Sequence, residues 1–128
     1  MSTAGGADAP HLPRLAPIEA YGNGGFRFAG MSHRGSILCL PDGIWAWPVS
    51  SSNQLNEFAL RPVIERAAAI DVFLLGAGGE PWTMPAYLRE LLHAAGASID
   101  AMQTGPAVRT YNVLLAENRR VAAGLIAV

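Results

Sequence analysis

An apolar stretch in the middle of the chain runs directly into a glycine-rich segment. Residues 72–75 are apolar at four consecutive positions, which is typical of a central strand that is covered on both faces. Gly76, Gly78 and Gly79 then predict a sharp turn at the carboxyl end of that strand. Ligands of α/β proteins bind at this end of the sheet. The segment therefore predicts an α/β fold and marks the first place to look for a site.

The part of the chain before this strand predicts a tail followed by two β-hairpins. Residues 1–17 are rich in Ala, Gly and Pro and show no periodicity, so we expect a flexible tail there. Alternating apolar residues on either side of turn residues predict the hairpins. The expected strands are 18–21, 26–28, 36–40 and 44–47. We therefore expect ordered structure to begin at Ile18.

The remaining sequence alternates between helical and strand patterns. Pro62 suits the first turn of a helix that runs to about Ala69, and Thr83 suits the cap of a second helix that ends at Gly96. The other expected elements are a strand at 98–102, a helix at 106–117 and a strand at 121–128. This order predicts a single α/β domain over residues 18–128, layered, with a mixed β-sheet, N-terminal hairpins and a βαβαβ C-terminal half.

Composition excludes several classes of function. The net charge is -1 and the chain contains no lysine, so we expect no nucleic-acid partner, no Schiff-base chemistry and no P-loop. No run approaches the roughly 18 apolar residues that span a bilayer, and no secretory signal opens the chain. Cys39 is the single cysteine and lies between leucines, which favours a buried core residue. We therefore expect a soluble, cytoplasmic protein that is not integral to a membrane.

The glycine turn does not meet the requirements of a known nucleotide motif. A dinucleotide fingerprint needs a third glycine where this chain has Pro81, and a Walker A motif needs a lysine. A small-anion or small-ligand pocket and a purely structural turn both stay open. The densest polar cluster near a strand end is Arg109, Thr110 and Asn112, of which the first and last share a helix face. The candidate ligand-binding residues are therefore Gly76, Gly78, Gly79, Arg109, Thr110 and Asn112.

Other reactive residues form no recognisable catalytic arrangement. Ser32 and His33 are adjacent, and side chains of adjacent residues in extended structure point apart. The three histidines and the carboxylates are scattered, so we expect no metal site, no cofactor and no catalytic residues. Trp45 and Trp47 share one face of a predicted strand. That face is either ordinary core or an aromatic patch that marks a partner surface.

Four segments of the chain resemble the small Mth-type domain-of-unknown-function family. Relatives in this family include mitochondrial complex I assembly factor three and the adipogenesis-associated Mth-domain protein. The matching segments are 21–28, 35–43, 74–78 and 102–125, the last of which contains Thr104, Ala107, residues 109–112, Leu115, Glu117 and residues 119–123. The family usually carries Gly-Thr-Gly at the glycine turn, where this chain has Ala77. The resemblance implies a layered α/β fold and no established enzymatic activity.

The sequence and the resemblance are consistent with two functions. The first is a non-enzymatic binding or assembly-factor domain that acts through protein contacts. The resemblance implies this function, together with a role in assembling respiratory or membrane complexes. The alternative is a small-ligand or anion pocket, with or without enzymatic activity, at residues 76–79 and 109–112. The sequence specifies neither the partner nor the oligomeric state.

Overall fold

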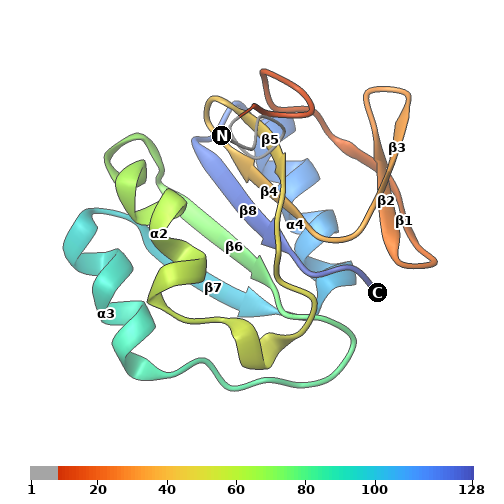
Figure 1. Ribbon diagram of the computed structural model, residues 1–128. Coiled ribbons are helices and arrows are strands. Elements are labelled where there is room, and N and C mark those ends of the chain that lie inside the picture. The colour runs from red at the N-terminus through yellow and green to blue at the C-terminus, as the bar shows by residue number, and fades with distance from the viewer. Residues whose placement is uncertain (1–8) are drawn as a thin grey trace.

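The computed structural model describes residues 9–128, which contain two β-sheets and three α-helices (Figure 1). The three-stranded antiparallel sheet consists of β1 (Ile18–Gly22), β2 (Gly25–Phe28) and β3 (Met31–Arg34). The five-stranded sheet has the order β5-β4-β8-β6-β7. Its strands are β4 (Ile37–Leu40), β5 (Gly43–Ala46), β6 (Val72–Gly76), β7 (Ser98–Met102) and β8 (Val121–Leu125). The helices are α2 (Glu57–Glu65), α3 (Ala86–Ala95) and α4 (Thr104–Ala116), with 3₁₀ turns η1 (Ser52–Gln54) and η2 (Ala67–Ala69).

The five-stranded sheet is mixed, as the sequence predicts. Strand β6 pairs in parallel with β7 on one side and with β8 on the other. Strands β4 and β5 form an antiparallel hairpin, and β4 pairs antiparallel with β8. The α/β class, the two hairpins and the parallel βαβ connections are therefore confirmed.

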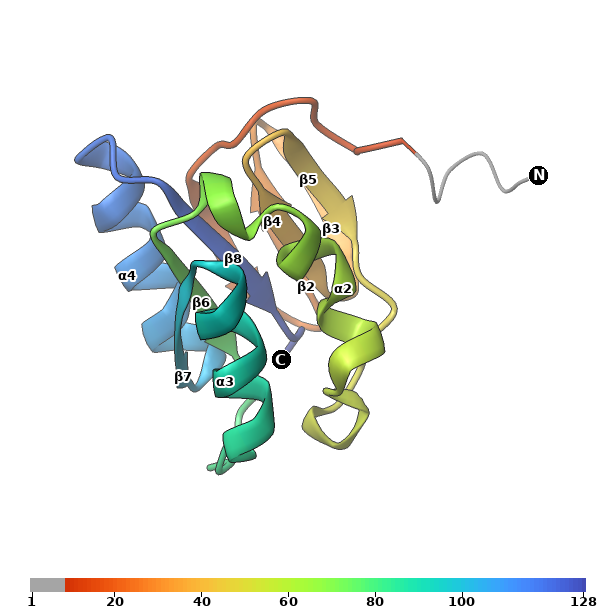
Figure 2. The same ribbon diagram turned by 90° about the vertical axis from the view of Figure 1, so that its left-hand side faces the viewer.

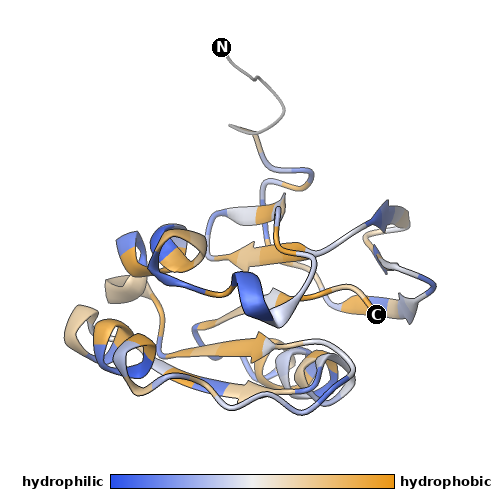
Figure 3. Ribbon diagram, turned by 60° about the horizontal axis from the view of Figure 1, so that its bottom comes forward, coloured by the Kyte–Doolittle hydropathy of each residue, from blue (hydrophilic) through white to orange (hydrophobic). Residues whose placement is uncertain are grey.

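Two layers cover the two faces of this sheet (Figure 2). Helices α2 and α3 cover one face, where Leu60 and Leu88 pack with Phe73 of β6. Helix α4 and the three-stranded sheet cover the other, where Tyr111 packs with Leu74. Neighbouring residues of β6 thus point into opposite cores, which explains the unbroken apolar run (Figure 3).

Two helices begin where the sequence interpretation did not place them. Helix α2 starts at Glu57 because the side chain of Asn56 accepts a hydrogen bond from the Ala59 N–H, at 2.9 Å. Pro62 therefore lies inside the helix and not in its first turn, so that expectation was wrong. Thr83 does not cap α3, since Pro85 occupies the N-cap position. Gly96 ends α3 in the left-handed conformation, at φ 108°, as expected.

Residues 9–17 pack against the domain, in contrast to the flexible tail expected over 1–17. Leu12 forms an antiparallel bridge with Ile44 of β5, and Ala16 is buried. Gly43 permits the bridge, because a Cβ there would lie 2.6 Å from the Leu12 carbonyl oxygen. Backbone pairing of this kind leaves no hydrophobic periodicity in the sequence. Residues 1–8 of the expected tail lie outside the described residues.

Candidate functional site

The glycine turn after β6 is tied to the start of α4 and to the end of β8. The Ala77 N–H donates to the Met102 carbonyl at 2.8 Å, and the Gly78 N–H donates to the Thr104 hydroxyl at 3.0 Å. That hydroxyl in turn donates to the Ile126 carbonyl at 2.7 Å. Thr104 is fully buried. The first two amides of the turn therefore have partners within the chain.

Packing explains one of the three predicted glycines, and backbone conformation explains a second. A Cβ on Gly76 would lie 3.0 Å from the Thr104 Cα and from the Leu125 Cδ2 atom, so helix α4 can approach β6 only because this residue has no side chain. Gly78 has φ 103°, a conformation that other residues avoid. Gly79 is exposed and has no such steric requirement. Ligand binding at this turn stays a prediction.

One residue of the predicted polar cluster on α4, Asn112, holds strand β1. The Asn112 side chain accepts a hydrogen bond from the Ile18 N–H at 2.8 Å and donates to the Ile18 carbonyl at 2.9 Å. Next to it, the buried Tyr111 hydroxyl donates to the Ala16 carbonyl at 2.9 Å. The Thr110 hydroxyl donates to the Pro106 carbonyl at 3.0 Å, and Arg109 is exposed.

The start of helix α4 and the polar cluster further along it lie at different distances from the glycine turn. Thr104, at the start of α4, touches the glycine turn directly. Asn112 lies eight residues further along α4, roughly 12 Å at the helical rise, and its amide is occupied by β1. The turn and Asn112 are therefore not brought together around a common ligand.

The remaining reactive side chains are shielded or dispersed. Burial raises the pKa of the Cys39 thiol to about 12, so it stays protonated near neutral pH. Burial, and next the neighbouring His11 ring at a centroid distance of 4.7 Å, lower the pKa of His33. Within residues 9–128, no group of three or more His, Cys, Asp or Glu side chains is placed to hold a metal ion.

A second candidate site lies between β5 and α2, and we call it the aromatic groove. It consists of two adjoining hollows of about 830 and 510 Å³. Trp47, Pro48, Pro62 and Glu65 line both hollows. Trp47 is held in place by its indole N–H, which donates to the Ala59 carbonyl of α2 at 3.2 Å.

The two tryptophans of the predicted aromatic face differ in burial. Trp47 is a core residue with 5% of its surface exposed, whereas Trp45 is only partly buried and lines the groove. Phe58 of α2 lies at the other end of the groove and is 73% exposed. The sequence identified the tryptophan face, but it contains no pattern that reveals an exposed Phe58.

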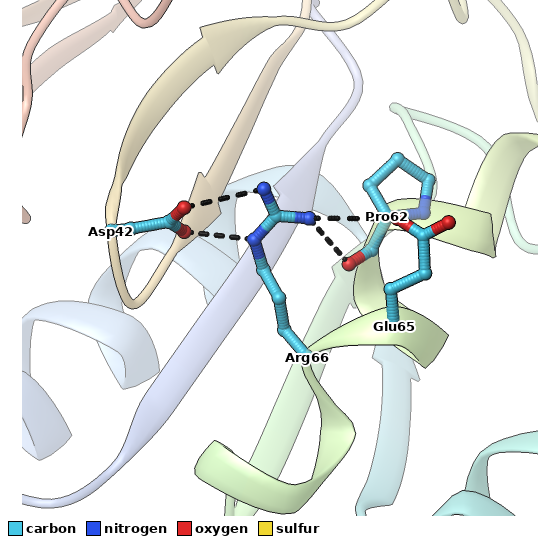
Figure 4. A network of polar contacts seen from close by, with 4 residues as sticks. All are labelled: Asp42, Pro62, Glu65 and Arg66. Atoms are coloured by element: carbon cyan, nitrogen blue, oxygen red, sulfur yellow. Dashed lines mark hydrogen bonds and ion pairs between the residues drawn. The ribbon is translucent and has the colours of Figure 1, made fainter.

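Arginine side chains border both ends of the groove. The Arg66 guanidinium lies 5.1 Å from the Trp45 ring centroid and makes two hydrogen bonds to the Asp42 carboxylate, at 2.8 and 3.2 Å (Figure 4). This pairing lowers the pKa of Asp42. The Arg61 guanidinium lies 5.4 Å from the ring centroid of Phe58. The groove is therefore an apolar surface with cationic groups stacked on its aromatic rings.

A family of proteins of unknown function, DUF498/DUF598, matches residues 18–126 of this chain. The chain belongs to this family. The match begins at the first residue of β1 and ends one residue after β8, so it covers both sheets and all three helices.

Proteins that are similar to this chain come from bacteria and from animals. An uncharacterized protein of Rhodobacter capsulatus is 39% identical, and the similarity covers 92% of each chain. Assembly factor 3 of the NADH dehydrogenase [ubiquinone] 1 alpha subcomplex from Danio rerio is 30% identical over 85% of this chain. The matched region makes up 63% of that assembly factor, so it contains further sequence outside the shared domain.

Solved structures confirm the Mth938-like fold. An outer membrane protein from Bartonella henselae, solved by crystallography, is 51% identical in sequence to this chain. The two structures superpose with a TM-score of 0.87 over 91% of this chain and 98% of that one. An Mth938-like domain of Bordetella pertussis is 26% identical, with a TM-score of 0.77, over 88% of this chain and 85% of that one. No helix in residues 9–128 has the length and apolar character needed to cross a bilayer.

Proposed function

We propose that this domain is a non-enzymatic binding protein that helps to assemble larger protein complexes and that the aromatic groove contacts the partner. The observation that carries the proposal is the exposed ring of Phe58 beside the two apolar hollows. Contiguous exposed apolar surface is typical of protein interaction sites. The animal relatives named as assembly factors support the same class of function.

The contacts of the groove suit a protein partner better than a reaction. Trp47 and Pro62 form its walls, and the side chains around them bear no nucleophile paired with a base. Burying a fully exposed phenylalanine contributes about 1.5–3 kcal/mol, and Phe58, with 73% of its surface exposed, can provide most of that as an anchor residue. The same proposal includes a cytoplasmic location and a respiratory or membrane complex as the target.

A matched pair of surface variants tests the proposal. Phe58→Ser removes the exposed ring from the groove, and Tyr87→Ser removes an exposed ring from α3, outside the groove. We expect quantitative affinity capture from native lysate to lose its specific partner with Phe58→Ser and to retain it with Tyr87→Ser. Both variants should melt within a few degrees of the wild type, because exposed substitutions change stability by only about 0.5 kcal/mol. Equal capture by both variants, or repeated capture of no partner, would contradict the proposal.

The small-ligand alternative, at residues 76–79 with Arg109 of α4 as its charged contact, has a separate test. It is favoured by the position of the turn at the carboxyl end of β6, which lies between two parallel strands. A ligand at 100 times its dissociation constant stabilises the folded state by about 2.7 kcal/mol. A thermal-shift screen of anions, nucleotides and metabolites that raised the melting temperature, with loss of the shift in Arg109→Gln, would support this pocket.

A further inference from the structure

The outer face of the three-stranded sheet carries two arginines beside residues with little or no side chain. The register places Ala20, Arg27 and Ser32 in one row across the strands, and it pairs Gly25 with Arg34 in the neighbouring row. The opposite face carries the buried Phe26 and Phe28, so alternation directs the arginine side chains outward. A hollow of about 470 Å³, which we call the basic hollow, lies at this surface.

The two arginines differ in how well their charge is balanced. Arg27 donates a hydrogen bond to the Ser32 hydroxyl at 3.0 Å and pairs with Glu19 at 3.4 Å. Arg34 has no ion pair within residues 9–128. Because Arg27 and Arg34 are diagonal neighbours on adjacent strands, their like charges repel. No carboxylate lines the hollow itself.

The turn between β1 and β2 leaves space next to these guanidinium groups. A Cβ built on Gly22 would meet no atom within 4 Å, so the surface above this residue is open. The Arg34 guanidinium lies close to Gly24, where a Cβ would be 4.0 Å from its Nη1 atom. The Asn23 side chain also lines the hollow and adds an amide donor. A ligand can therefore approach the backbone while it contacts donors from β2, from β3 and from the turn between β1 and β2.

We propose that the basic hollow binds a small molecule through a phosphate group held between Arg27 and Arg34. The planar fork of a guanidinium matches the oxygens of a phosphate and forms strong, charge-assisted hydrogen bonds with it. A doubly charged group between the two arginines also removes their mutual repulsion. The hollow is larger than a phosphate ion, so the rest of the molecule can extend along Ala20 and Gly22 of β1, which share the outer face with the arginines. This site is separate from the aromatic groove and does not depend on the proposed function.

Phosphate titration of the ¹⁵N-labelled protein, followed by NMR at constant ionic strength, tests this site. We expect saturable shifts of the amides of residues 22–25 and 34 with inorganic phosphate, and tighter binding of glycerol phosphate. Arg34→Gln should weaken binding about tenfold or more, because it removes a charge-assisted contact. Arg119→Gln, an exposed arginine outside the hollow, should bind as the wild type does.

Three results would overturn the proposal. The first is the absence of saturable shifts in the hollow. The second is equal weakening by Arg34→Gln and Arg119→Gln, which indicates general screening of charge. The third is tighter binding of acetate than of phosphate, which assigns the hollow to carboxylates. Thermal melts of both variants verify that each is folded, so that a loss of shifts reports on binding.

Discussion

Replacing Thr104 by valine tests whether the glycine turn is primarily structural. The fully buried Thr104 hydroxyl accepts from the Gly78 N–H and donates to the Ile126 carbonyl, at 3.0 and 2.7 Å. Valine has nearly the same shape but neither of these bonds. Both backbone groups would then lie unpaired in a site that water does not reach.

The magnitude follows from the cost of leaving buried polar groups without partners. Each such group costs about 1–3 kcal/mol, so a working figure for Thr104→Val is about 3 kcal/mol. At about 2.1 cal/mol/K for each residue, the unfolding entropy of residues 9–128 is roughly 0.25 kcal/mol/K. One kcal/mol therefore corresponds to about 4 °C, and the melting temperature should fall by roughly 12 °C.

Thr104→Ser is the matched control. It keeps the hydroxyl and loses one buried methyl group, which costs about 1 kcal/mol, or roughly 4 °C. In urea unfolding, the free energy of the three proteins should fall with denaturant concentration at the same slope, because the surface exposed on unfolding hardly changes. Their midpoint urea concentrations should differ. A valine variant as stable as the serine variant would refute the structural interpretation of these two hydrogen bonds.

Three further predictions concern residues away from the turn. Gly124→Ala should lower the free energy of unfolding, measured in urea, by about 1–3 kcal/mol, because the added Cβ would lie 2.8–2.9 Å from two aromatic rings. Gly79→Ala, where the added Cβ has room, should leave it nearly unchanged. The folded-state pKa of His33 is lowered, so the unfolded chain binds more protons and the free energy of unfolding falls as the pH drops below about 6.5. His33→Gln should flatten this fall, which melting temperatures measured across the pH range would show. The buried Cys39 thiol should react with a thiol reagent only after denaturation, and rapid reaction of the native protein would contradict its burial.

The sequence predicts those strands and helices whose hydrophobic pattern follows directly from how they are buried. Residues 72–75 are continuously apolar because they contact both cores, and this pattern identified the central strand. Strand β3 was missed because Ser32, His33 and Arg34 carry no apolar alternation, and its pairing with β2 is what makes it a strand. At α2, the sequence contains both a capping residue, Asn56, and a proline that suits a first turn, Pro62, and in the structure the helix begins after Asn56.

The candidate site depends on contacts that the sequence cannot reveal. The hydrogen bond between Gly78 and Thr104 joins residues 26 positions apart, and those between Ile18 and Asn112 join residues 94 positions apart. A glycine turn and a polar helix face are visible locally, but the partners that occupy their polar groups become known only from the fold. Residues that look like a binding site can therefore serve to hold helix α4 against strands of both sheets.

The burial of Ala77 shows how little of the glycine turn is accessible from outside. Ala77 is 6% exposed and belongs to the core between the five-stranded sheet and helices α2 and α3. A threonine at this position would place its hydroxyl in that core, where it would need a hydrogen-bonding partner. Position 77 thus faces inward, and of residues 76–79 only Gly79 is exposed. Of these four residues, Gly79 is therefore the one that a ligand at the turn would meet first.

The two open surfaces described above lie on different layers of the molecule (Figure 1). Helix α2, which carries Phe58, packs mainly on α3 and η2, whereas β3, which carries Arg34, packs mainly on β2. Substitutions at distant sites without shared partners add in their effects on free energy within about 0.5 kcal/mol. A Phe58→Ser change should therefore leave phosphate affinity at the basic hollow unaltered, and Arg34→Gln should leave partner capture unaltered. Coupling between the two changes would mean that one ligand spans both surfaces or that the three-stranded sheet moves with α2.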